Sequence, residues 1–129
     1  MAYSTIVTEA AKPVANYKMA TRLERGRLVY ISGQVAWDAN GNIVGTGDIR
    51  AQARQAFENL RQVLRAAGGD LRDLLKITTY LTKLEDFPAV AETRSTIFQG
   101  ELPASTLIVV PSLFHSDFLI EIEGVAAIE

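Results

Sequence analysis

The sequence predicts an α+β fold in which two helices cover one face of a mixed β-sheet. Two stretches repeat hydrophobic residues every three or four positions, which is the spacing of a helix with one buried face. Short β-prone runs, separated by turn residues, precede and follow these stretches. One run lies between the two helical stretches, so the expected order is β-β-(β)-α-β-α-β-β, with the helices on one side of the sheet.

The first third of the chain predicts a β-hairpin. Residues 17–21 and 28–34 are β-prone, and the polar stretch 22–27 between them contains Gly26. A second reversal is expected at residues 38–41, Asp-Ala-Asn-Gly, because Asn and Gly tolerate positive φ. The residues on either side of it, Trp37 and Ile43, should therefore lie close together.

The clearest helix begins at residue 49. Asp48 is a suitable N-cap, and Gly68 and Gly69 favour the left-handed conformation that ends many helices. The hydrophobic positions that define its buried face are Ile49, Ala53, Ala56, Phe57, Leu60, Val63, Leu64 and Ala67.

A strand and a second helix follow. Residues 76–82 alternate, with Ile77, Thr79 and Leu81 on one face and Lys76, Thr78 and Tyr80 on the other. Residues 86–98 return to helical spacing, with Pro88 in the first turn and Gly100 just beyond the end.

The last third predicts two strands, at residues 105–110 and 118–128. The loop between them begins at Pro111 and contains His115, the only histidine. Two helices can cover one face of the sheet only, and an apolar uncovered face needs a partner. Oligomerisation is therefore expected.

Composition predicts one domain, residues 1–129, with a hydrophobic content of 48% and a charged content of 22%. A net charge of −2 gives no overall attraction to nucleic acid. The chain has no cysteine, no signal-peptide pattern and no hydrophobic run of membrane length. We expect a cytoplasmic protein without a membrane partner.

The final strand carries the most informative local pattern. Residues 120–123 are Ile-Glu-Ile-Glu, so Glu121 and Glu123 share the face opposite the isoleucines. This face is either simply solvated, as in many antiparallel sheets, or it places a carboxylate in a cleft where a raised pKa suits acid–base chemistry.

Three other residues allow two interpretations each. Ser32 and Gly33 end a strand, where such a pair forms a bend or bulge, or lets a ligand approach the backbone. Tyr17 is either a core or interface aromatic residue or a hydroxyl that faces a ligand.

Taken together, several segments resemble the Rid family, the YjgF-type reactive intermediate deaminases. They occur in the family's order: residues 16–17 (Asn-Tyr), 30–34 (Tyr-Ile-Ser-Gly-Gln), 51–60 (AQARQAFENL), 102–104 (Leu-Pro-Ala) and 120–126 (IEIEGVA). The resemblance extends over nearly the whole chain.

This resemblance implies a chorismate-mutase-like fold and a homotrimer with a central barrel, with small-molecule clefts between subunits. It implies hydrolysis of enamines and imines to oxo compounds and ammonia, without a metal or other cofactor. By the same resemblance Glu121 activates water, Ser32 and Gly33 bind the ligand, and Tyr17 lines the cleft.

Ser105 departs from the family pattern, in which arginine follows Leu-Pro-Ala and binds the substrate carboxylate. A serine hydroxyl is neutral and short, whereas a guanidinium forms two parallel hydrogen bonds with a carboxylate. We therefore expect poor activity on 2-imino acids, although Arg22 or Arg94 of a neighbouring subunit could supply the cation instead. A non-catalytic binding or regulatory trimer is the alternative.

A third hypothesis, RNA-directed activity, rests on a basic stripe in the first helix formed by Arg50, Arg54, Arg61 and Arg65. The net negative charge and Glu58 favour an ordinary solvated face instead. His115 alone cannot form a multi-histidine metal site. It is either a solvated loop residue or a proton shuttle for Glu121.

Overall fold

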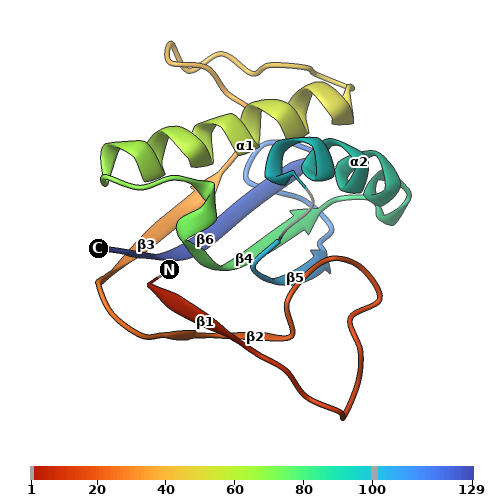
Figure 1. The fold of residues 1–129 in the computed structure, drawn as a ribbon. Coiled ribbons are helices and arrows are strands. Elements are labelled where there is room, and N and C mark those ends of the chain that lie inside the picture. The colour runs from red at the N-terminus through yellow and green to blue at the C-terminus, as the bar shows by residue number, and fades with distance from the viewer. Residues whose placement is uncertain (1, 100–101) are drawn as a thin grey trace.

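A computed structural model describes residues 2–99 and 102–129. Its main sheet has the strand order β3-β6-β4-β5, in which β4 and β5 are parallel and the other pairs antiparallel. Both helices lie on one side of this sheet (Figure 1), which confirms the predicted arrangement of two helices on a mixed sheet. The elements are β1 (Tyr3–Ile6), β2 (Ala20–Leu23), β3 (Arg27–Gln34), α1 (Ile49–Ala66), β4 (Leu74–Leu81), α2 (Phe87–Phe98), β5 (Ala104–Val109) and β6 (Ile120–Ile128).

The predicted hairpin between residues 17–21 and 28–34 is wrong. β2 pairs with β1, a strand that the sequence pattern did not indicate, and the two form a separate antiparallel sheet. β3 pairs instead with β6. The physical reason is burial: Val29 and Ile31 of β3 pack against the core beneath the helices, whereas Arg22 and Leu23 of β2 are exposed.

The signals at both ends of α1 are confirmed. The Asp48 carboxylate accepts a hydrogen bond of 3.1 Å from the Ala51 amide, and Gly68 has a φ of +91° just after the helix. Between these ends, Phe57 and Leu60 are completely buried. The Phe57 ring packs edge-on against Phe98 of α2, with centroids 5.6 Å apart, and so joins the two helices.

The other boundaries also follow the sequence. Pro88 lies in the first turn of α2, and Trp37 and Ile43 form the expected antiparallel bridge. α2 ends at Gln99, which adopts the left-handed conformation with a φ of 54°. The expected stop at Gly100 lies outside the described residues.

The two faces of the main sheet differ. Beneath the helices, Ile77, Ile120 and Ile122 are completely buried. On the opposite face, β1 and β2 cover one end, where Tyr3 packs in a small cluster with Ala127 and others. The remainder of this face, which we call the open face, leaves three large side chains well exposed in the isolated chain: Tyr30 (76%), Leu28 (42%) and Ile108 (40%).

No helix among the described residues is long and apolar enough to span a membrane.

Candidate functional site

A β-bulge places the Ser-Gly pair beside the final strand. The register between β3 and β6 runs from Ile31 opposite Gly124 to Gln34 opposite Ile122, so β3 has one extra residue in this interval. Ser32 and Gly33 fill the bulge, and both are exposed. Bulges of this kind are common next to active sites, because they change the direction of a side chain or expose backbone.

The Glu121 carboxylate lies directly against Gly33. A β-carbon added at Gly33 would be 2.1 Å from Glu121 Oε2 and 2.6 Å from Glu121 Cδ, far inside van der Waals contact. Only glycine therefore leaves room for the carboxylate in this position. The structure thus brings Glu121, Gly33 and the adjacent Ser32 together.

Burial raises the pKa of Glu121 above its ordinary value, and the nearby charge of Glu123 raises it further. Both causes disfavour the ionised carboxylate. The side chain is nevertheless only half-buried, so it keeps access to solvent. A carboxyl group of this kind can accept a proton from water and return it to a substrate at a pH closer to neutrality than an ordinary glutamate.

Tyr80 of β4 completes this group of residues. It lies directly opposite Glu121 in the antiparallel β4–β6 register, and its hydroxyl donates a short hydrogen bond to Glu123 Oε1. That hydrogen bond, with smaller contributions from burial and from both glutamates, raises the pKa of Tyr80. Tyr80 therefore stays protonated and fixes Glu123, whose charge acts on Glu121.

Tyr17 and Ser105 lie elsewhere in the chain. Residue 18 forms a parallel bridge with Ala104, and the Lys18 amide donates to the Pro103 carbonyl at 3.2 Å, so Tyr17 runs beside the beginning of β5. Ser105 is opposite Ile77 in the parallel β4–β5 register. Neighbours in register share a face, so Ser105 is on the helix-covered side and Glu121 is on the open side.

Within one chain these two groups do not form a single site. β6 and β5 are separated by β4, and the registers of Glu121 and Ser105 on β4 differ by three residues. With strands about 4.8 Å apart and about 3.3 Å per residue, the two residues lie more than about 10 Å apart on opposite faces.

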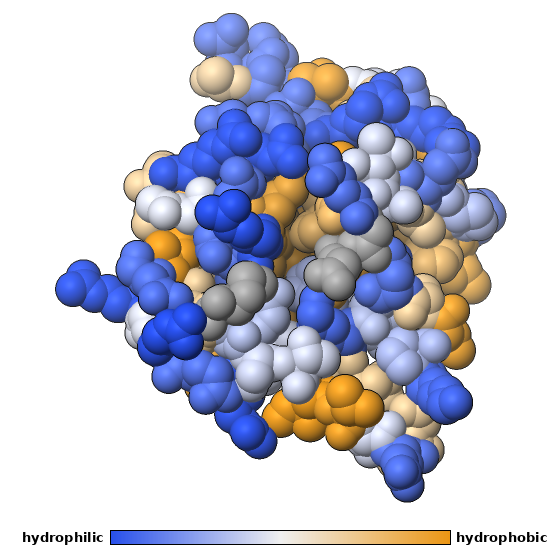
Figure 2. All heavy atoms as spheres, in the orientation of Figure 1, coloured by the Kyte–Doolittle hydropathy of each residue, from blue (hydrophilic) through white to orange (hydrophobic). Residues whose placement is uncertain are grey.

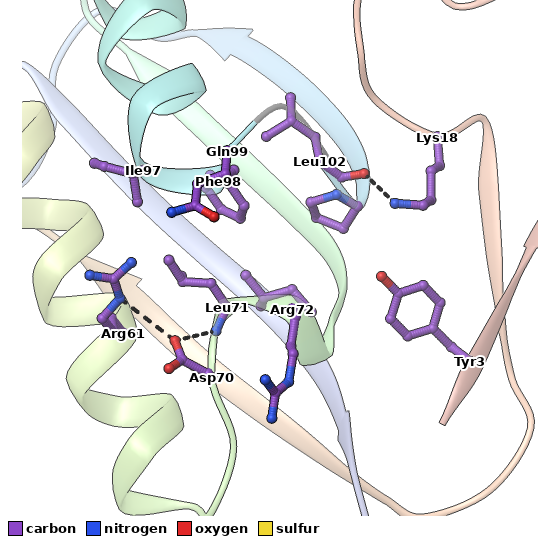
Figure 3. Close-up of a pocket in the computed structure, with 12 residues that line it drawn as sticks. Tyr3, Lys18, Arg61, Asp70, Leu71, Arg72, Ile97, Phe98, Gln99 and Leu102 are labelled. Carbon is purple, nitrogen blue, oxygen red and sulfur yellow. Dashed lines mark hydrogen bonds and ion pairs between the residues drawn. The ribbon is translucent and has the colours of Figure 1, made fainter. Parts of the chain in front are cut away.

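A cavity among the described residues contains none of Tyr17, Ser32, Gly33, Ser105 and Glu121. It has a volume of about 470 Å³ and is lined by residues near the beginning of β4, the opposite end of that strand from Tyr80. Figure 2 shows a hollow with a hydrophobic floor in this view. Charged side chains border the cavity (Figure 3), and two of them have partners: Arg61 Nε is 3.6 Å from Asp70 Oδ1, and Lys18 Nζ donates to the Leu102 carbonyl at 2.8 Å.

The basic stripe is largely neutralised. Arg50 pairs with Glu92 at 3.1 Å, Arg65 with Asp70 at 3.3 Å, and Arg61 with both Glu58 and Asp70. A phosphate backbone would have to compete with these carboxylates. The stripe is therefore poorly suited to binding RNA.

His115 lies in the loop predicted for it and is exposed. Its Nδ1 accepts a hydrogen bond of 3.0 Å from the Asp117 amide, and its ring is 5.7 Å from that of Phe118. Among the residues that the structure describes, no three His, Asp or Glu side chains form a group that could hold a metal ion.

Sequence reasoning missed Tyr80 as a site residue. The alternating pattern places it on the open face, but only the β4–β6 register shows that it lies opposite Glu121. The sequence pattern placed Glu123 on the same face as Glu121, but it did not predict the hydrogen bond that Glu123 accepts from Tyr80.

Comparison with known proteins gives consistent results. The family described as Endoribonuclease L-PSP matches residues 7–128. A RutC family protein of Pyrococcus horikoshii is 38% identical over 94% of each chain. The 2-iminobutanoate/2-iminopropanoate deaminase of Mus musculus is 36% identical and covers 92% of this chain and 86% of its own. The 3-aminoacrylate deaminase RutC of Acinetobacter baylyi is also 36% identical, with 88% of each chain covered.

Solved structures agree with this fold. A Rid family protein of unknown function from Yersinia pestis has a TM-score of 0.90 and 33% identity, covering 99% of this chain and 100% of its own. RidA of a Psychrobacter species has a TM-score of 0.73 and 34% identity, covering 97% and 99% respectively.

Proposed function

The chain belongs to the Rid family, described as Endoribonuclease L-PSP, and we propose that it is an enamine or imine hydrolase that works as a homotrimer. The observation that carries this proposal is the half-buried Glu121 carboxylate held against Gly33, with its pKa raised. Relatives named as imine and 3-aminoacrylate deaminases support the reaction class.

The proposed site residues form two separate groups within one chain, and this separation supports a cleft between subunits. Glu121, Ser32 and Gly33 lie on one side of the sheet, and Tyr17 and Ser105 lie beyond β4 at the other edge. Association of chains through the open face would cover Tyr30, Leu28 and Ile108. A trimer with a central barrel, as the resemblance implies, would then bring Tyr17 and Ser105 of one subunit to Glu121 of the next.

In this cleft Glu121 would accept a proton from a water molecule as the water oxygen bonds to the imine carbon. The C=N bond becomes a single bond and the nitrogen takes up the proton from Glu121, which gives a carbinolamine and restores the carboxylate. The carbinolamine collapses to a carbonyl group and ammonia, while its hydroxyl proton passes to the leaving nitrogen through Glu121. An enamine first gains a proton on carbon and loses one from nitrogen, which gives the imine. Ser32 and the backbone at Gly33 would orient the ligand.

Ser105 narrows the substrates that we propose. It cannot form the bidentate pair that a guanidinium makes with a carboxylate. The unchanged protein should therefore be inefficient on small 2-imino acids, which have few other groups for binding. The same residue favours the alternative function, a trimer that binds a small molecule without turning it over.

Glu121→Gln tests the proposed reaction. Imines produced by an amino acid oxidase are followed to the 2-oxo acid, and amine-derived imines without a carboxylate are followed by ammonia release. We expect Glu121→Gln to reduce turnover of the best substrate by about 10² to 10⁴, the usual contribution of an acid–base group.

Light scattering on both proteins should give three subunits per particle. A stable monomer would remove the composite cleft, and unchanged turnover in Glu121→Gln would remove the proposed role of this residue. If the unchanged trimer binds imine-derived products but hydrolyses none of the imines, the binding function replaces the enzymatic one.

A further inference from the structure

The turn between β3 and α1 contains the only Asn-Gly pair of the sequence, Asn40 and Gly41. Both residues are exposed, and their segment projects beyond α1 at the top of Figure 1. Gly41 has a φ of +79°, and a β-carbon added to it would meet no atom within 4 Å. The pair therefore lies in an open turn where water reaches both the side chain and the backbone.

The side-chain amide of Asn40 makes no hydrogen bond to any residue within 2–99 and 102–129. Only its backbone is held, since the Asn40 amide nitrogen donates to Asp38 Oδ1 at 2.9 Å. By contrast, the side chain of Asn59 on α1 donates to the carbonyls of Val35 and Trp37, each at 2.9 Å. The Asn59 amide is thus fixed in place, whereas the Asn40 amide is free to rotate.

This arrangement suits an attack of the backbone on the side chain. The nitrogen of Gly41 and Asn40 Cγ belong to the same short stretch of chain, so ring closure is intramolecular and has a high effective concentration. Glycine has no β-carbon to hinder the approach of its nitrogen. After Asn42, in contrast, the β-branched side chain of Ile43 crowds the corresponding nitrogen.

One hydrogen bond opposes the attack. The Gly41 amide donates to the Asp38 carbonyl at 3.0 Å, and this bond must open before the nitrogen can turn to Asn40 Cγ. It is a single bond in an exposed turn, where local opening costs much less free energy than unfolding of the domain. Release of Asn59 would instead require α1 to separate from the segment that follows β3.

We propose that Asn40 is a site of spontaneous modification, at which its side-chain amide is replaced by a carboxylate. The Gly41 nitrogen bonds to Asn40 Cγ, and its proton leaves with the side-chain nitrogen as ammonia, which gives a cyclic succinimide. Water then opens the ring at one of its two carbonyl groups. Opening at Cγ gives aspartate, and opening at the backbone carbonyl gives isoaspartate, in which the main chain runs through Cγ. One water is consumed and one ammonia is released.

The modification should loosen the contact between Trp37 and Ile43. The Asp38 amide donates to the Asn42 carbonyl at 2.9 Å, and Asp38 Oδ1 accepts from the Asn42 amide at 3.0 Å. These bonds support the bridge between Trp37 and Ile43, and isoaspartate inserts an extra main-chain carbon between them. Trp37 is the only tryptophan and packs on Phe118 with ring centroids 5.8 Å apart, so its fluorescence reports the change.

Prolonged incubation of the purified protein in a mildly alkaline buffer, followed by tryptic digestion and mass spectrometry, tests the proposal. Residues 28–50 form one tryptic fragment that holds Asn40 and Asn42, and residues 55–61 form another that holds Asn59. We expect aspartate and isoaspartate to form at Asn40 at least about tenfold faster than at the other two, a difference of about 1.4 kcal/mol in the barrier.

Asn40→Gln keeps an amide but would have to close a larger ring, so it should lose the product, whereas the matched variant Asn42→Gln should retain it. Acrylamide quenching of Trp37 fluorescence should increase during incubation of the unchanged protein and of Asn42→Gln, but not of Asn40→Gln. Equal conversion at Asn40 and Asn59 would overturn the inference. Conversion of Asn40 in the urea-unfolded chain but not in the folded protein would also overturn it, because the hydrogen bonds of the turn would then protect the residue.

Discussion

Alternate residues of β6 belong to two different environments. Ile120 and Ile122 point beneath α1 and α2 and are completely buried, whereas Glu121 and Glu123 point to the open face and are half-buried. The first face is filled by the chain itself. The second holds a bulge, two glutamates and a tyrosine, together with exposed hydrophobic residues that the chain alone does not cover.

This difference separates the residues that stabilise the chain from those that can act on a ligand. A buried isoleucine contributes through the hydrophobic area it removes from water and through close packing. A half-buried glutamate contributes little to stability, but its pKa depends strongly on its neighbours. Substitutions on the covered face should therefore mainly reduce stability, whereas substitutions on the open face should mainly reduce activity.

The largest effect on stability is expected from the covered face, at Phe57. This side chain is completely buried and packs edge-on against Phe98. Phe57→Ala should lower the free energy of unfolding by about 3 to 5 kcal/mol, since it leaves a cavity between the helices. Urea denaturation at fixed protein concentration measures this change.

Tyr30→Ala is the matched change on the open face, where the ring is 76% exposed in the single chain. It should weaken association of subunits without a comparable loss of stability in the chain. A small effect of Phe57→Ala on unfolding would show that the core is packed differently.

Gly33→Ala should separate activity from stability. The added methyl group would lie 2.1 Å from Glu121 Oε2, and the carboxylate is the flexible end of its side chain, so it can move away at little cost to the fold. A catalytic group displaced by about 1 Å can lose about 10²-fold in rate. We expect a fall of that order in imine turnover and a melting temperature close to that of the unchanged protein. Full activity in this variant would show that Glu121 need not lie against Gly33.

The sequence predicted the covered face well, because that face follows a local pattern. The periodicity of residues 49–67, the Asp48 cap and the alternation in β4 and β6 all depend on neighbours close in sequence. β1 was missed because a strand of four residues is too short to show a clear alternation of hydrophobic and polar side chains. The partner of β2 was wrong because a strand's own sequence does not specify which strand it pairs with.

The candidate site was predictable only in part. The carboxylate of Glu121 and the Ser32-Gly33 pair were recognised through the family resemblance, and the bulge that joins them is consistent with it. The place of Tyr80 opposite Glu121 depends on the register between β4 and β6. A local sequence pattern does not encode that register, because the two strands are far apart in the chain.

Ser105→Arg should create a gain of function on the helix-covered side. A guanidinium at this position can clamp a carboxylate with two hydrogen bonds, which serine cannot do. We expect at least about a tenfold increase in 2-imino acid hydrolysis, corresponding to about 1.4 kcal/mol of additional binding in the transition state. The assay couples an amino acid oxidase to detection of the 2-oxo acid.

Thr106→Arg is the matched control, because Thr106 pairs with Thr78 and points to the open face. The double variant Ser105→Arg, Glu121→Gln should lose the gain. A folded Ser105→Arg trimer without increased activity would mean that the cleft has diverged beyond this one position, which favours a different ligand.

The smallest effect is expected from Glu123→Gln, which changes the environment of Glu121 without moving it. Burial is the larger cause of the raised pKa of Glu121 and the charge of Glu123 the smaller one, so removing that charge should lower the pKa while leaving it above the ordinary value. Glu121 acts as a base in its ionised form, so activity rises as the pH rises through its pKa. The acid limb of the kcat/KM profile should therefore shift to lower pH.

The side-chain amide that Glu123→Gln introduces can still accept the hydrogen bond from Tyr80, so the geometry of the group should be preserved. Glu129→Gln removes an equal charge at the far end of the sheet, where Glu129 pairs with Arg25, and should leave the profile unchanged. A shift to higher pH in Glu123→Gln would mean that the titrating group is not a base or is not Glu121. An identical shift in both variants would assign the effect to net charge. A local interaction with Glu121 is possible for Glu123 but is screened for the distant Glu129.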